Sequence, residues 1–159
     1  MKRDVTLECT YDSTPDEVWT ALTDPAALSE WLMPVEGFVP QVGQRFLFRA
    51  KPMPGWDGTV ACEVLEVDRP RRLAYTWKGG GKAIPATTVT WILEPTSEGT
   101  RVRLEHSGFT TVPGVLLSFV MGRGWVDILQ RRLKNAVEAP GRSTVVPASP
   151  LGAPGPSES

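Results

Sequence analysis

The sequence predicts an α+β fold in which a curved antiparallel sheet of six to seven strands wraps around one long C-terminal helix. Three observations lead to this prediction: a strand with a period of two opens the chain, two short helices follow it, and a run of strands ends in one long helical segment. The apolar face of such a sheet needs cover, and only the last helix is long enough to provide it.

The beginning of the chain contains one strand and two helix starts. Apolar and polar residues alternate over 5–11, which predicts a strand with one buried face. Residues 14–17 read Thr-Pro-Asp-Glu, a capping box with proline at the first helical position, so a short helix is expected up to Leu22. Asp24-Pro25 repeats the arrangement of a cap followed by proline, which predicts a second short helix ending near Trp31.

The middle of the chain reads as a series of short strands separated by glycine and proline. Asp57-Gly58 is typical of a tight hairpin turn, because such turns need a positive φ. Strands are expected over 45–49, 59–67, 73–77, 87–94 and 100–107. From 113 to 137 the apolar period changes to that of a helix, which predicts one long amphipathic helix. Gly122 and Gly124 lie inside it, and each costs about 1 kcal/mol relative to alanine. They are expected to mark either a kink or a place where the sheet approaches the helix closely.

The last two predicted strands form a hairpin whose register can be inferred. A register in which Trp91 opposes Leu104 and Val89 opposes His106 places every apolar residue on one face. A slip by one residue would reverse that face. His106, the only histidine, is therefore expected to point inward with Trp91 diagonally near it.

Composition limits the classes of function. The chain has 159 residues and a formal net charge of −1, which argues against an electrostatically driven nucleic-acid binder. No apolar run is long enough for a membrane span, and no secretory signal is visible at the N-terminus. Cys9 and Cys62 suggest two buried free thiols in a reducing cytoplasm rather than a disulfide or a metal site. We expect one folded domain over 3–138 and a disordered tail rich in proline, glycine and serine over 139–159.

Several stretches of the chain carry a family resemblance. They are 18–25, 31–34, 42–46, 63–77, 88–91, 105–109 and 124–125. In these stretches the chain resembles the SRPBCC or START-like superfamily, which has the helix-grip fold of the birch-pollen allergen. Within that superfamily it is similar to bacterial homologues of the C-terminal domain of the activator of the ninety-kilodalton heat-shock protein ATPase. The resemblance implies a ligand cavity between sheet and helix, but members bind lipids, hormones or polyketides, and some cyclise or hydrolyse.

The leading hypothesis is a protein that binds a small hydrophobic ligand, with a stress-response role or a role in handling lipids or polyketides. His106 would be the polar contact, and aromatic residues would form the wall. The residues expected to bind the ligand are Phe46, Phe48, Trp77, Trp91, His106, Phe109, Phe119 and Trp125. Trp31 and Trp56 are expected to gate the mouth, and Gly124 to mark its position. No metal or cofactor is expected.

Two other classes of function stay open. A cyclase-like or hydrolase-like enzyme would use His106 as a base, and Glu63 as an acid if the third strand turned that side chain inward. A co-chaperone-like or dimeric interaction module is suggested by the apolar segment 113–121, where related bacterial proteins often carry charge. That segment is expected either to form a hydrophobic cavity mouth or to meet a second subunit.

Overall fold

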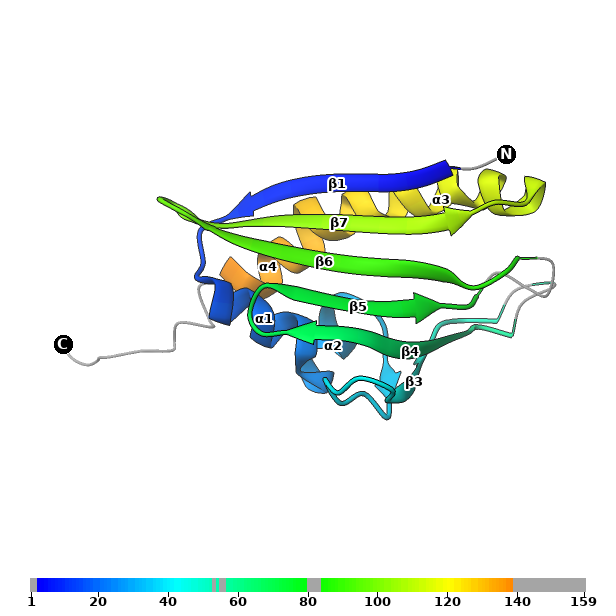
Figure 1. Ribbon diagram of the computed structural model, residues 1–159, viewed down its shortest axis with the longest axis horizontal. Helices are drawn as coiled ribbons and strands as arrows, with labels where there is room; N and C mark the ends of the chain where they lie inside the picture. Colours follow the sequence, from blue (N-terminus) through cyan, green and yellow to red (C-terminus); the bar gives the residue numbers. More distant parts are fainter. Residues whose placement is uncertain (1–2, 53, 55–56, 80–83, 139–159) are drawn as a thin grey trace.

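The computed structural model describes residues 3–52, 54, 57–79 and 84–138, and it confirms the predicted α+β fold. One antiparallel sheet has the strand order β1-β7-β6-β5-β4-β3-β2, and the helices lie behind it in Figure 1. The strands are β1 (Arg3–Tyr11), β2 (Val35–Glu36), β3 (Arg45–Arg49), β4 (Thr59–Asp68), β5 (Arg72–Trp77), β6 (Thr87–Thr96) and β7 (Gly99–Phe109). The helical segments are α1 (Pro15–Thr23), α2 (Pro25–Trp31), α3 (Val112–Asp127), η1 (Ile128–Arg132) and α4 (Leu133–Glu138).

Helix α1 begins with the predicted capping box. The backbone N–H of Glu17 donates to Thr14 Oγ1 at 3.2 Å, and the Glu17 carboxylate accepts from the backbone N–H of Thr14 at 2.8 Å. Two of the helix's unpaired N–H groups are in this way satisfied reciprocally. At α2, Asp24 takes the N-cap position but makes no side-chain capping bond. Only the predicted proline at the start of the helix, Pro25, is confirmed there.

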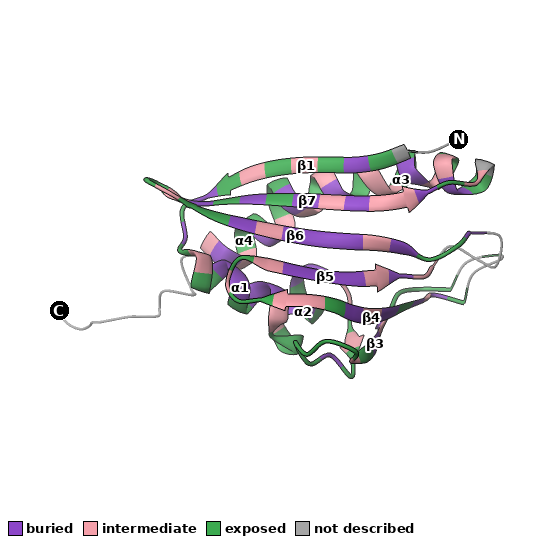
Figure 2. Cartoon of the chain, in the orientation of Figure 1, coloured by how far each residue is buried: buried purple, intermediate pink, exposed green. Residues whose placement is uncertain are grey.

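The hairpin of β6 and β7 has the predicted register. Trp91 pairs with Leu104, and Val89 pairs with His106. All four of these side chains are fully buried, which shows that this face of the hairpin points toward the helices. Figure 2 shows this alternation along β7, whereas the central strands β5 and β6 each have a run of three buried positions, 73–75 and 89–91.

Two features of the sheet were not predicted. Strand β2 has only two residues and pairs with β3, so it is too short to leave a periodic signal in the sequence. In β4 the pairing shifts between Val64 and Glu66, which is a β-bulge. Before this bulge Cys62 and Val64 are buried while Ala61 is exposed, and this decides which face of the third predicted strand is internal.

The C-terminal helical region is continuous, but it is not one uniform α-helix. Its interruption is the π-helical segment η1 rather than a kink at either glycine. Within η1 the backbone N–H of Leu133 bonds to the carbonyl of Ile128, five residues back. The carbonyl of Leu129, which an α-helix would have paired with Leu133, accepts from the buried hydroxyl of Tyr11 at 2.7 Å. Strand β1 thus fixes the helix at its irregular turn.

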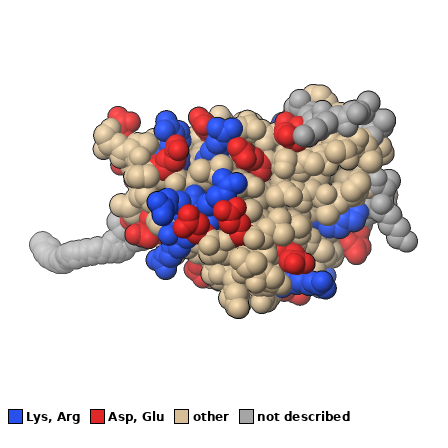
Figure 3. Space-filling view, viewed as in Figure 1, with Lys and Arg blue, Asp and Glu red and all other residues tan. Residues whose placement is uncertain are grey.

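The outer face of the sheet carries alternating charges. Blue and red side chains are interspersed over one half of that face in Figure 3. Arg103 forms ion pairs with Glu8 and Glu105, and Arg101 pairs with Glu94, each across or along neighbouring strands. This is a solvated face with both signs of charge balanced. Among the described residues, no helix is long and apolar enough to cross a membrane.

Three predictions fall on residues that the structure does not describe. The tail over 139–159 lies outside the described residues, and so do Trp56 and residues 80–83 of the glycine-rich loop. The predicted tail boundary and the gating role of Trp56 therefore stay predictions.

Candidate functional site

A cavity of about 470 Å³ lies between helix α3 and the inner face of the sheet. Helix α3 and η1 supply half of its described wall, and the rest comes from the end of α2, strands β4 and β5 and the adjoining loops. The lining residues are Leu32, Met33, Pro54, Val60, Trp77, Gly79, Leu117, Val120, Met121, Gly124, Trp125 and Ile128. None of these twelve described residues is charged, so the site favours an apolar ligand.

Gly124 keeps one part of the cavity wall open. A Cβ at this position would meet nothing within 4 Å, whereas a Cβ on Gly122, one half-turn earlier, would lie 3.7 Å from the side chain of Val5. Gly122 therefore allows helix α3 to approach β1, and Gly124 leaves space beside Trp125. The prediction that Gly124 marks a pocket agrees with its place in the wall.

Behind the wall, Trp125 is held by a chain of hydrogen bonds. Its indole Nε1 donates to His106 Nδ1 at 2.9 Å, so that nitrogen must be unprotonated. The proton of the neutral ring is then on Nε2, which donates to Thr87 Oγ1 at 2.7 Å. Thr87 in turn donates to the carbonyl of Trp77 at 3.1 Å. Both ring nitrogens of His106 are consequently occupied.

The environment of His106 keeps the ring neutral. Its side chain has no exposed surface, and the rings of Phe109, Trp77 and Trp125 lie with centroids 4.6, 5.7 and 6.0 Å away. Burial lowers the pKa of His106 to about 3, because the charged imidazolium would lose its hydration. His106 points inward as predicted, but Trp125 lies between it and the cavity. The structure supports a positioning role for His106, not direct contact or acid–base chemistry.

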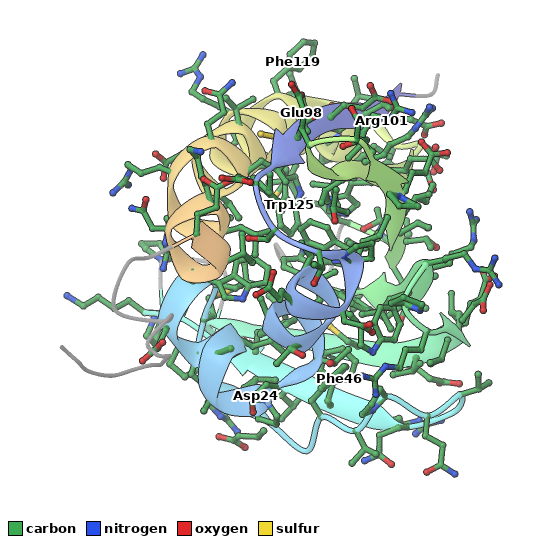
Figure 4. All side chains as sticks on the ribbon, turned by 90° about the vertical axis from the view of Figure 1, so that its left-hand side faces the viewer. Asp24, Phe46, Glu98, Arg101, Phe119 and Trp125 are labelled. Atoms are coloured by element: carbon green, nitrogen blue, oxygen red, sulfur yellow. The ribbon has the colours of Figure 1, made fainter. Side chains whose placement is uncertain are left out.

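The structure divides the eight residues expected to bind a ligand into three groups. Trp77 and Trp125 line the cavity. The remaining inward residues are buried in the core and do not line it: Phe46, Phe48, Trp91, His106 and Phe109. Phe119 is 54% exposed and projects away from the interior, whereas Trp125 points into it (Figure 4).

The prediction that Trp31 gates the mouth is wrong. Trp31 is buried, its Nε1 donates to the carbonyl of Ala21 at 2.8 Å, and its ring packs edge-on against Trp91 at 5.8 Å. A side chain fixed in this way is part of the core. It anchors helix α2 to the sheet, so that the residues following the helix reach the cavity.

The alternative in which Glu63 points inward is also wrong. Its side chain is 43% exposed and lies 3.5 Å from Arg45, its cross-strand partner on β3. Cys62 occupies the inner face instead, and burial raises the pKa of its thiol to about 12. Cys9 is only partly buried, at the edge of the same core. Among the described residues, no three histidine, cysteine or acidic side chains cluster as metal ligands.

Most of the cavity wall was not identified from the sequence. Leu117, Val120 and Met121 belong to the segment 113–121, which was expected from its apolar character to form a hydrophobic cavity mouth or to meet a second subunit, but they were not predicted individually. The contributions of Leu32 and of the loop residue Pro54 left no such signal. Their positions depend on how helix α2 and the loops pack against α3.

Several solved protein structures have the same fold as this chain. The protein MLL2253 from Mesorhizobium loti is 32% identical, with a TM-score of 0.77 over 87% of this chain and 98% of that chain. DynU16, a putative protein in the dynemicin biosynthetic locus, is 25% identical with a TM-score of 0.68, over 86% of this chain and 47% of that chain. The Aha1 dimer from Colwellia psychrerythraea is 21% identical with a TM-score of 0.70, over 86% and 97%.

The sequence itself matches one family model. No curated protein matches it. The model for Activator of Hsp90 ATPase homolog 1-like protein matches residues 12–138, which include both short helices, strands β2 to β7 and the whole C-terminal helical region. Because this match covers well over half of the sequence, the chain belongs to the Activator of Hsp90 ATPase homolog 1-like family.

Proposed function

We propose that this protein binds a small hydrophobic ligand in the cavity between helix α3 and the sheet. The observation that carries the proposal is the cavity itself, about 470 Å³ with an uncharged described wall. Ligand sites in proteins usually measure about 300–1,000 Å³ and are mainly apolar. A side-chain-filled interior would have left no such space. The position of Gly124 in the wall supports the same conclusion, because any other residue would fill part of it.

The wall and one of the similar proteins support a particular class of ligand. The apolar lining favours a lipid-like or polyketide-like molecule over a charged metabolite, because burying an unpaired charge is costly. The similar protein DynU16 belongs to the dynemicin biosynthetic locus, and this supports a role in handling such molecules. We place this role in the bacterial cytoplasm, where the free thiols Cys9 and Cys62 would stay reduced.

The cavity can be tested by filling it. Native mass spectrometry of freshly purified protein should detect a bound molecule, and the neutral probe N-phenyl-1-naphthylamine should bind with increased fluorescence. Gly124→Leu should weaken probe binding by about tenfold or more, because the leucine side chain would occupy part of the cavity. A tenfold loss corresponds to about 1.4 kcal/mol of binding free energy. Gly122→Ala, in the same helix but away from the cavity, is the matched control. Probe binding that is absent, or equal in wild type and Gly124→Leu, contradicts the proposal.

A second candidate function is a homodimer formed through the segment 113–121. Leu116, Phe119 and Val120 are 64%, 54% and 67% exposed, and their spacing puts them on one stripe of helix α3. The similarity to the Aha1 dimer from Colwellia psychrerythraea supports this candidate. Light scattering should give twice the monomer mass for wild type and the monomer mass for Leu116→Glu. A monomeric wild type would contradict it.

A further inference from the structure

The cavity wall contains a buried hydrogen-bond donor that has no acceptor. Trp77 is 7% exposed and lines the cavity, yet in the described part of the chain nothing accepts from its indole Nε1. The rings around it belong to Phe48 and Trp125, with centroids 5.6 and 5.5 Å away. His106 also lies near, at 5.7 Å, but both of its nitrogens are already engaged.

The other indoles of this region show what is unusual about Trp77. Trp31 donates to a backbone carbonyl, Trp91 donates to the hydroxyl of Tyr75 at 3.0 Å, and Trp125 donates to His106. Buried polar groups are paired in the large majority of cases, so an unpaired one at a cavity is a candidate for pairing with a ligand. Of the two indoles in the described wall, Trp77 is the one whose N–H is not already used.

We propose that the ligand carries a hydrogen-bond acceptor oxygen, and that Trp77 Nε1 donates to this oxygen when the ligand is bound. The inference rests on the proposed ligand-binding function and narrows it to neutral, largely apolar carbonyl compounds. A carboxylate or phosphate does not fit, because the described wall offers no cationic side chain to pair with it. A pure hydrocarbon would leave the donor unpaired, and this lowers its affinity.

A pair of nearly isosteric ligands tests this inference. Fluorene and 9-fluorenone have the same planar tricyclic skeleton, and only fluorenone carries a carbonyl oxygen. Both should bind to the wild-type protein, in competition with N-phenyl-1-naphthylamine, and fluorenone should bind the more tightly. The dissociation constant of fluorene divided by that of fluorenone measures the preference for the carbonyl compound. Trp77→Phe should lower this ratio by about three- to tenfold, which is the usual contribution of one hydrogen bond. Comparing ratios cancels the different hydration of the two ligands.

The chain offers a matched control for the loss of an unpaired indole. Trp19 is also buried and has no acceptor in the described part of the chain, but it does not line the cavity. Trp19→Phe should therefore leave the fluorene-to-fluorenone ratio unchanged. If both ligands bind but Trp77→Phe keeps the wild-type ratio, the inference is overturned while ligand binding stands. If neither ligand binds to the wild type, both the inference and the proposed function are overturned.

Discussion

The indole of Trp125 and the imidazole of His106 form one buried unit, joined by a hydrogen bond of 2.9 Å from Nε1 to Nδ1. Trp125 comes from helix α3 and His106 from strand β7, so this bond connects the helix to the sheet directly behind the cavity. Because an indole can only donate, the bond also sets the tautomer of the histidine. The residue that faces the cavity is thus positioned by one that does not.

The buried His106 should make the protein sensitive to acid. Its folded-state pKa of about 3 is lower than the ordinary value of 6.5, so between these values the unfolded chain binds a proton that the folded protein does not. Stability is therefore complete above pH 6.5 and is lost as the pH falls toward 3, by about 1.4 kcal/mol per unit. Urea unfolding at pH 6.5 and 4.5 measures this loss.

A neutral substitution separates this effect from the acidic side chains. His106→Gln can accept from Trp125 and donate to Thr87, but it does not titrate. Between pH 6.5 and 4.5 the variant should lose about 2–3 kcal/mol less unfolding free energy than the wild type does. Equal losses in the two proteins would show that His106 does not cause the acid sensitivity.

Removing one hydroxyl should weaken the attachment of the C-terminal helix. Tyr11 donates to the carbonyl of Leu129, which lacks the α-helical partner that it would otherwise have had. Tyr11→Phe leaves this buried carbonyl unpaired, and we expect the free energy of unfolding to fall by about 1–2 kcal/mol. A loss of less than about 0.3 kcal/mol in urea titrations would mean that another group satisfies the carbonyl.

Two glycines are required for separable reasons, one in the turn between β3 and β4 and the other just before β3. Gly58 has a φ of +87°, and a Cβ there would lie 2.3 Å from the carbonyl oxygen of Ala50. Gly43 has a φ of +89°, but a Cβ there would meet nothing within 4 Å. Gly43→Ala should cost about 1 kcal/mol for backbone strain alone, and Gly58→Ala should cost at least about 1 kcal/mol more. Thermal unfolding of the two variants compares these costs, and equal values would contradict the clash.

The sequence was sufficient for features that depend on neighbours along the chain. The capping box at Thr14 and the register that opposes Val89 to His106 both arise within a few residues of a turn or helix start. In such places the apolar period and the turn chemistry act on the same short segment. For the same reason, the inward direction of His106 could be predicted from the hairpin alone.

The wall of the cavity needed the tertiary structure. Alternation along a strand shows which residues face inward, but not which of them lie under helix α3 and which lie in solid core. Phe48 and Trp77 share the inner face, yet only Trp77 reaches the cavity. The direction of the Glu63 side chain could not be predicted from the sequence either, because it depends on how β4 pairs with β3. The sequence alone determined the α+β fold, the hairpin register and the apolar character of the site. The packing of α3 across the sheet decided which inward residues line the cavity and that His106 lies behind Trp125, because that contact joins residues far apart in the chain.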